Sequence, residues 1–184
     1  MTILITEIKP GVTFEWRGNI LRCVKYDHIK WAQQARIRLK MKNLRTGSIV
    51  EDTFNVGERF EPAHISYRPM QYLYNDGNTY HFMDQENFNQ IELAKEKLGD
   101  TYNYLKDGFL VNIAFYGDEA LEVTLPAAVE LKVVETSPGN KGDTVSGGKP
   151  ATMETGLVVS VPFFVNAGDV LKVDTRDGKY LGRA

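Results

Sequence analysis

Residues 35–42 read Ala-Arg-Ile-Arg-Leu-Lys-Met-Lys, and this stretch decides the class of fold. Apolar and cationic side chains alternate strictly, which is the period of a β-strand with one buried face. The buried face would carry Ala35, Ile37, Leu39 and Met41, and the outer face Arg36, Arg38, Lys40 and Lys42. We therefore expect a half-buried strand whose solvent face is wholly cationic.

The residues around this strand also read as short strands bounded by turns. Residues 12–16 and 20–26 are separated by Arg17-Gly18-Asn19, a hairpin signal. A turn at 43–47 leads from the cationic strand into a further strand at 48–54. An all-β run of this length predicts a small SH3-like barrel, with residues 27–35 as the loop at the tip of a hairpin.

The rest of the chain repeats this pattern. Strands at 71–74 and 79–83 flank an Asp-Gly turn, a strong hairpin signal. Residues 84–93 are polar and turn-like, 94–105 read as a short helix, and strands at 109–116 and 121–125 form another hairpin. Joints are expected at 62–68 and 126–128. Two five-stranded OB barrels would accommodate the segments that follow each joint.

Strand-like runs at 129–134 and 157–161 flank a long stretch rich in Gly, Pro, Ser, Thr and Lys. Backbone polar groups in such a stretch need water or a partner, so residues 134–156 are expected to form a surface loop. Long loops inside compact domains are usually binding elements or disordered. We favour binding.

Composition narrows the class of protein. The chain has 184 residues, of which 42% are hydrophobic and 25% charged, as in ordinary globular proteins. One cysteine, Cys23, leaves no internal disulfide framework and no multi-cysteine metal site. The chain begins with a strand-like run in place of a signal peptide, and no apolar run approaches the ~20 residues that span a bilayer. These features predict a cytoplasmic protein without membrane contact.

Charge is distributed unevenly along the chain. Residues 1–64 carry a net charge of +4, residues 65–126 carry −6 and residues 127–184 carry 0, within a total of −2. Different thirds are thus expected to face different partners, although charge can also fluctuate between domains without functional meaning.

No enzyme site is visible in the sequence. The three histidines, His28, His64 and His81, lie far apart and lack metal-ligand spacing. Nucleophile motifs and paired carboxylates are missing, and Ser146-Gly147-Gly148-Lys149 lacks the upstream glycine of a P-loop. The chain is expected to bind without catalysing a reaction, and to need neither a metal nor a cofactor.

Three further stretches carry the resemblance to a known family. They are Lys149-Pro-Ala-Thr-Met-Glu-Thr-Gly156, Val161-Pro-Phe-Phe-Val-Asn-Ala-Gly168 and Val173-Asp-Thr-Arg-Asp-Gly-Lys-Tyr-Leu-Gly-Arg-Ala184. Together they closely resemble the C-terminal domain of bacterial elongation factor P, and the rest of the chain resembles the family more loosely. The resemblance implies three small barrels: an SH3-like (KOW-like) domain at 1–64, an OB-fold at 65–126 and a second OB-fold at 127–184.

The resemblance also implies where RNA would be bound. The loop in the first barrel would reach the acceptor end of a transfer RNA, through Lys30, Trp31, Ala32, Gln33 and Gln34. In the family this tip usually carries a modified lysine or an arginine among glycines and prolines, which this chain lacks. The cationic face formed by Arg36, Arg38, Lys40 and Lys42 would meet RNA phosphates. Trp31 could instead pack as a lid on the barrel, and the cationic face could be merely solvated.

The C-terminal domain would supply the remaining contacts. The family's D-arm loop corresponds here to Gly142, Asp143 and Thr144, and further candidates for RNA contact are Lys149, Tyr180 and Arg183. Flexibility of the loop, and barrel packing of Tyr180 and Arg183, are the structural alternatives.

The function implied is that of a translation elongation factor. It would bind both ribosomal subunits beside the P-site peptidyl-tRNA as a monomer, promote peptide-bond formation and relieve stalling at consecutive prolines. Three alternatives remain: a paralogue with an unmodified loop and a shifted target, a general OB-type binder of single-stranded nucleic acid, and a protein-interaction module. The acidic and neutral charge of the last two thirds argues against the general binder.

Overall fold

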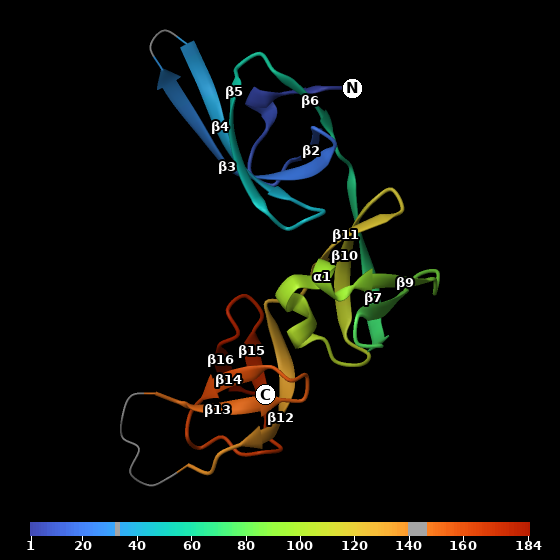
Figure 1. Cartoon of the computed structure of the whole chain (residues 1–184), viewed down its shortest axis with the longest axis vertical. Helices are drawn as coiled ribbons and strands as arrows, with labels where there is room; N and C mark the ends of the chain where they lie inside the picture. Colours follow the sequence, from blue (N-terminus) through green and yellow to red (C-terminus); the bar gives the residue numbers. More distant parts are fainter. Residues whose placement is uncertain (32–33, 140–146) are drawn as a thin grey trace. The chain divides into compact units, whose positions relative to one another are not determined.

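The computed structural model describes residues 1–31, 34–139 and 147–184, and within these it consists of antiparallel β-sheets with short helical segments (Figure 1). Contacts divide the chain into two compact units. Unit 1 comprises residues 1–68 and 113–122, and unit 2 comprises residues 69–112 and 123–184. The all-β prediction is confirmed.

The first sheet has the strand order β1-β6-β2-β3-β4-β5. Its strands are β1 (Ile3–Leu4), β2 (Thr13–Trp16), β3 (Asn19–Trp31), β4 (Gln34–Asn43), β5 (Ile49–Asn55) and β6 (Arg59–Pro62), with a 3₁₀ turn η1 (Ile5–Glu7) after β1. The alternation in β4 is confirmed for Ile37, Leu39 and Met41, which are buried in the core of this sheet. The predicted burial of Ala35 was wrong, because Ala35 is exposed in the outer part of the hairpin, where it pairs with Lys30. Edge-to-face contacts of Phe60 with Phe14 and Phe54 complete that core.

Strands β3 and β4 form a hairpin that projects beyond the other strands of the sheet (Figure 1). Pairing continues outward to Trp31 and Gln34, with one irregularity in register between Cys23 and Lys25. The expectation of a loop over 27–35 was therefore too long. Polar residues there suggested a loop, but cross-strand hydrogen bonding holds them in extended conformation even where no core lies beneath.

The second sheet has the order β11-β10-β7-β8-β9. Its strands are β7 (Ile65–Asn75), β8 (Thr79–Asp84), β9 (Gln90–Ala94), β10 (Leu110–Tyr116) and β11 (Glu119–Thr124). The Asp-Gly turn is confirmed: Asp76 accepts hydrogen bonds from the backbone of Asn78 and Thr79, and Gly77 has a φ of 106°.

Two expectations for this segment were wrong in part. Residues 90–93 form strand β9, not part of a turn. The predicted helix over 94–105 is limited to α1 (Lys95–Leu98) and a 3₁₀ segment η2 (Gly99–Tyr104). Gly99 ends α1 with a φ of 54°, a conformation that an α-helix cannot contain.

The third sheet has the order β14-β13-β12-β15-β16. Its strands are β12 (Ala128–Thr136), β13 (Lys149–Met153), β14 (Val158–Val161), β15 (Val170–Asp174) and β16 (Tyr180–Arg183). Its core also contains Tyr104 of η2, which is only 6% exposed, and burial raises the pKa of this phenol. The last turn of η2 thus belongs to the hydrophobic core of the C-terminal sheet.

Strand β13 lies inside the stretch that the sequence suggested was one long loop. Lys149, Ala151 and Met153 are buried on one face of it. Pro150 concealed the strand, because proline lacks the N–H that a central strand needs. Its position tolerates proline because pairing with β12 begins only at Ala151. Gly148, just before the strand, lies so close to β14 that a Cβ there would be 2.2 Å from the backbone oxygen of Val161.

Candidate nucleic-acid interface

The outer face of β4 carries the cationic strip, formed by Arg36, Arg38, Lys40 and Lys42. Arg36 and Arg38 lie in the outer half of the β3–β4 hairpin and are exposed. Neither side chain has an ion pair or hydrogen bond with another described residue. Two guanidinium groups two residues apart on one strand face are separated by about 7 Å along the strand. They are free to meet successive anionic groups of a partner.

The inner half of the strip is neutralised. Lys42 forms an ion pair with Glu122, and Arg22, its cross-strand neighbour, donates to the other oxygen of the same carboxylate at 3.0 Å. Lys40 lies 3.7 Å from Glu51 on β5. The four cations of the strip are therefore not equivalent, and charge is most available toward the tip of the hairpin.

Glu122 belongs to a set of acidic contacts within unit 1, the acidic clamp, formed by Glu15, Glu119 and Glu122. Arg45 Nε donates to Glu119 Oε1, and Arg45 Nη2 donates to Glu119 Oε2, each at 2.9 Å. This hydrogen bonding raises the pKa of Arg45. Tyr116 donates to Glu15, which raises the pKa of Tyr116.

The clamp accounts for part of the uneven charge along the chain. Glu119 and Glu122 belong to the acidic middle third, and they pair with cations of the basic first third. Sequence reasoning missed these contacts because the partners are 74 to 100 residues apart. The opposite net charges of the two segments were the only signal.

Side chains near the hairpin tip are described in part. Lys30 and Gln34 are exposed, and His28 lies 3.1 Å from the hydroxyl of Tyr26. The backbone of Trp31 pairs with Gln34 as the last residue pair of the hairpin. Ala32 and Gln33, the remaining tip candidates, lie outside the described residues.

The three C-terminal residues predicted to contact RNA, Lys149, Tyr180 and Arg183, make contacts within the C-terminal sheet and its loops. Lys149 is buried, and its ammonium donates to the backbone oxygen of Ser137 at 2.6 Å, so it points inward. Tyr180 packs against the C-terminal core. Arg183 donates to Asp169 and the backbone oxygen of Phe164, and lies over the Phe164 ring.

Gly142, Asp143 and Thr144, the predicted D-arm loop, lie outside the described residues. Among the predicted site residues that the structure describes, those of the β3–β4 hairpin are the ones that lie together on one element.

The described residues offer neither a metal site nor a membrane-spanning helix. Within them no group of three or more His, Cys, Asp and Glu side chains could hold a metal ion. The helical segments there are all too short and too polar to cross a membrane.

Three family models match successive parts of the chain. Residues 4–60 match the elongation factor P KOW-like domain, residues 65–123 the elongation factor P OB domain, and residues 129–183 the elongation factor P C-terminal domain. These matches agree with the expected order of an SH3-like barrel followed by OB-folds.

Individual relatives match over nearly the whole chain. Elongation factor P of Carboxydothermus hydrogenoformans is 46% identical over 98% of this chain and 99% of its own. Elongation factor P of Moorella thermoacetica is 47% identical over 99% of this chain and 100% of its own.

A solved structure shares the fold. Eukaryotic translation initiation factor 5A from Methanococcus jannaschii aligns with a TM-score of 0.51 and 19% identity, over 67% of this chain and 95% of its own. The domain order, the all-β fold and the full-length similarity lead to one conclusion: the chain belongs to the elongation factor P family of translation elongation factors.

Proposed function

We propose that this factor binds the ribosome beside the P-site peptidyl-tRNA, promotes peptide-bond formation and thereby relieves stalling at consecutive prolines. The observation that carries this proposal is the β3–β4 hairpin, which projects from its sheet with Arg36 and Arg38 exposed and unpaired among the described residues. Such a hairpin can follow an RNA backbone while its tip reaches further along the same molecule. Membership of the family supports the ribosomal context.

The mechanism requires no chemistry from the protein. Residues 30–34 at the tip would contact the acceptor end of the transfer RNA, while Arg36 and Arg38 hold its phosphates. An aminoacyl end held in a reactive pose loses less entropy on reaching the transition state. Poor substrates such as proline would gain most from this alignment.

The remaining partners follow from the same arrangement. Gly142, Asp143 and Thr144 would read the D-arm, and the C-terminal domain would reach the small subunit. The factor would act as a cytoplasmic monomer. We propose three modules at 1–64, 65–126 and 127–184, which are supported by the three family matches.

Cosedimentation with ribosomes tests the proposal. Ribosomes that carry P-site transfer RNA should retain the protein better than ribosomes that lack it. A general single-strand binder would not need the transfer RNA, and a protein-interaction module would not respond to RNA at all.

The double variant Arg36→Gln/Arg38→Gln should weaken this binding and reduce its salt slope by roughly one per lost phosphate contact. The control Lys9→Gln/Arg59→Gln removes the same charge from exposed positions elsewhere in the first module. Equal slopes for the two double variants would show that Arg36 and Arg38 are only solvated.

The tip sequence suggests that the hairpin works without modification. Ala32, Gln33 and Gln34 provide no lysine where the family usually has one. Mass spectrometry of the native protein should find no adduct on residues 27–36. An added mass on Lys30 would contradict this and make Lys30 the modified residue.

A further inference from the structure

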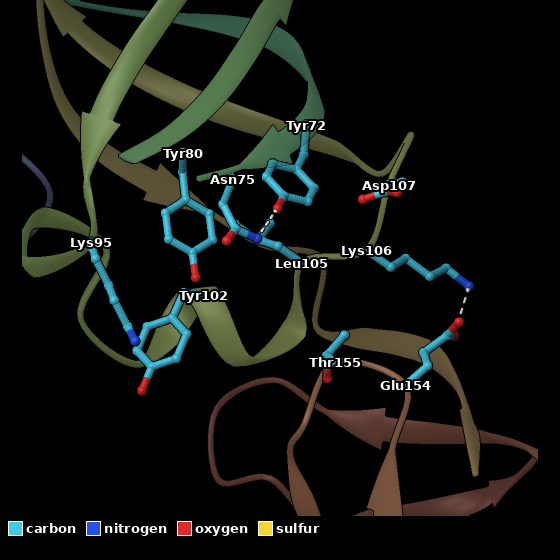
Figure 2. Close-up of a pocket in the computed structure, with 10 residues that line it drawn as sticks. All are labelled: Tyr72, Asn75, Tyr80, Lys95, Tyr102, Leu105, Lys106, Asp107, Glu154 and Thr155. Atoms are coloured by element: carbon cyan, nitrogen blue, oxygen red, sulfur yellow. Dashed lines mark hydrogen bonds and ion pairs between the residues drawn. The ribbon is translucent and has the colours of Figure 1, made fainter. Parts of the chain in front are cut away.

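Unit 2 contains a cavity of about 540 Å³ that is distant in sequence from the hairpin (Figure 2). Its walls come from β7, β8, α1, η2 and the segment after η2, and from the turn that follows β13. The lining residues are Tyr72, Asn75, Tyr80, Lys95, Tyr102, Leu105, Lys106, Asp107, Glu154 and Thr155. The volume lies within the range typical of small-molecule sites, roughly 300–1,000 Å³.

Three tyrosines form one wall of the cavity. The rings of Tyr72 and Tyr80 stack with centroids 5.8 Å apart, and the ring of Tyr102 lies 6.2 Å from that of Tyr80. Tyr72 and Tyr80 are almost fully buried, whereas Tyr102 is half-buried and presents its ring and hydroxyl more openly. Burial raises the pKa of Tyr72 and of Tyr80, so both phenols stay neutral and able to donate hydrogen bonds.

Not every hydroxyl in the cavity has a partner. The Tyr72 oxygen accepts a hydrogen bond from Asn75 at 2.7 Å. Figure 2 marks this bond with a dashed line. The hydroxyls of Tyr80 and Tyr102 have no hydrogen-bond partner among the described residues. Thr155 Oγ1 is buried and equally without one. Buried polar groups are normally satisfied, so such hydroxyls mark a place where a polar ligand would be favoured.

The charges around the cavity differ in their availability. Lys106 donates to the backbone oxygen of Glu130 at 2.8 Å and lies 3.7 Å from Glu154, so its charge is compensated. Figure 2 marks the contact between Lys106 and Glu154. Lys95 lies over the Tyr102 ring at 4.3 Å and has no carboxylate at ion-pair distance among the described residues. The exposed carboxylate of Asp107 likewise has no ion pair within the described part of the chain.

We propose that this tyrosine pocket binds a nucleotide through its 5′-phosphate, its sugar and its base. The phosphate would meet the uncompensated ammonium of Lys95, and the base would lie against the Tyr102 ring. Tyr80 and Tyr102 would donate to acceptors of the base, and Asp107 would accept from a ribose hydroxyl or an exocyclic amine.

Other ligand classes fit the pocket less well. An apolar ligand would leave the tyrosine hydroxyls and Lys95 unpaired, at a cost in free energy. A free amino acid is small for a cavity of this volume, and it would leave the aromatic wall unused. A nucleotide combines an anion, a planar ring and donors for Asp107 in one molecule. The inference does not depend on ribosome binding, since a free nucleotide on the isolated protein tests it.

The experiment titrates the full-length protein with each of the four 5′-nucleoside monophosphates and follows amide chemical shifts by NMR. At least one of them should produce saturable shifts at the pocket residues. Inorganic phosphate and the corresponding nucleoside, titrated separately, should each bind at least about tenfold more weakly, because each satisfies only part of the site.

Three variants locate the site. Lys95→Gln should raise Kd by about tenfold, and Tyr102→Phe, which keeps the ring, by roughly threefold to tenfold. Lys97→Gln is the matched control, because Lys97 lies on the same short helix, is exposed and does not line the pocket. Its Kd should stay within about twofold of the wild type.

Absence of saturable shifts for all four nucleotides would overturn the proposal. An equal loss for Lys97→Gln and Lys95→Gln would show that only general charge attraction was measured. If inorganic phosphate bound as tightly as the nucleotides, the pocket would be an anion site and the nucleotide assignment would be wrong. Unchanged circular dichroism and thermal unfolding of the three variants exclude misfolding as the cause of weaker binding.

Discussion

Replacing Glu122 with glutamine tests the acidic clamp most directly. The carboxylate pairs with both Arg22 and Lys42, and the three side chains are 19%, 23% and 35% exposed. Exposed ion pairs contribute about 0–1 kcal/mol, whereas breaking a buried pair costs about 3–5 kcal/mol. The intermediate burial of this triad places the loss at about 2 kcal/mol, because glutamine leaves two cations side by side with only one acceptor oxygen.

Tryptophan fluorescence is a suitable assay, because both tryptophans of the chain, Trp16 and Trp31, belong to unit 1. Trp16 also packs edge-to-face on Phe54, so its emission should change when that unit unfolds. With a urea m-value near 2 kcal/mol/M, the midpoint should fall by roughly 1 M.

The control is Glu51→Gln, which makes the same chemical change at a more exposed ion pair. Its free energy of unfolding should change by less than about 0.5 kcal/mol. If Glu122→Gln shifts the midpoint no further than Glu51→Gln does, the clamp contributes nothing beyond an ordinary surface pair and the reasoning is refuted.

Three further predictions concern single positions. Gly148→Ala should destabilise the C-terminal sheet by about 1–3 kcal/mol, because the new methyl group would collide with backbone atoms. Gly147→Ala is the control, since its methyl group would meet nothing within 4 Å. Equal thermal unfolding temperatures for the two variants would contradict this prediction. Hydrogen bonds from the Arg176 side chain and backbone hold the pKa of Asp174 at about 2, below its ordinary 3.8. The stability that ionised Asp174 contributes should therefore be complete above pH 3.8 and should disappear toward pH 2. The thermal unfolding temperatures of wild type and Asp174→Asn should converge over that range. A constant difference between them would refute the assignment. Cys23 is buried and burial raises its pKa, so iodoacetamide should label it slowly in native protein and rapidly in urea; equal rates would show that the thiol is accessible.

Local patterns predicted the fold well where one residue period or one turn dominated. The alternation at 35–42 correctly predicted the burial of Ile37, Leu39 and Met41, and the Asp-Gly pair predicted the β7–β8 turn. The sequence did not predict strands β9 and β13. Polar residues made β9 resemble a turn, and Pro150 argued against a strand at β13, although both segments contain a short alternation. In both strands, cross-strand pairing overrides weak local preference: β9 pairs with β8, and β13 pairs with β12 and β14.

The candidate site was predictable only in outline. Sequence identified four cations on one strand face, but it could not show that Lys42 is paired with Glu122 while Arg36 and Arg38 are not. Lys149 looked like a solvent-exposed lysine in a loop, and its burial follows from a strand that the sequence concealed. Availability of a charge depends on tertiary neighbours, which a residue pattern does not contain.

The burial of Tyr104 in the C-terminal core means that the last barrel is not a self-contained building block. A fragment beginning at residue 127 would expose a gap the size of a phenol ring, and deleting a buried aromatic side chain costs about 3–5 kcal/mol. That is a large share of the roughly 5–15 kcal/mol that stabilises a typical domain. During synthesis Tyr104 leaves the ribosome before any strand of the last barrel, so the missing piece is already present when that barrel closes. Exchange of the C-terminal barrel between relatives would therefore have to carry η2 with it.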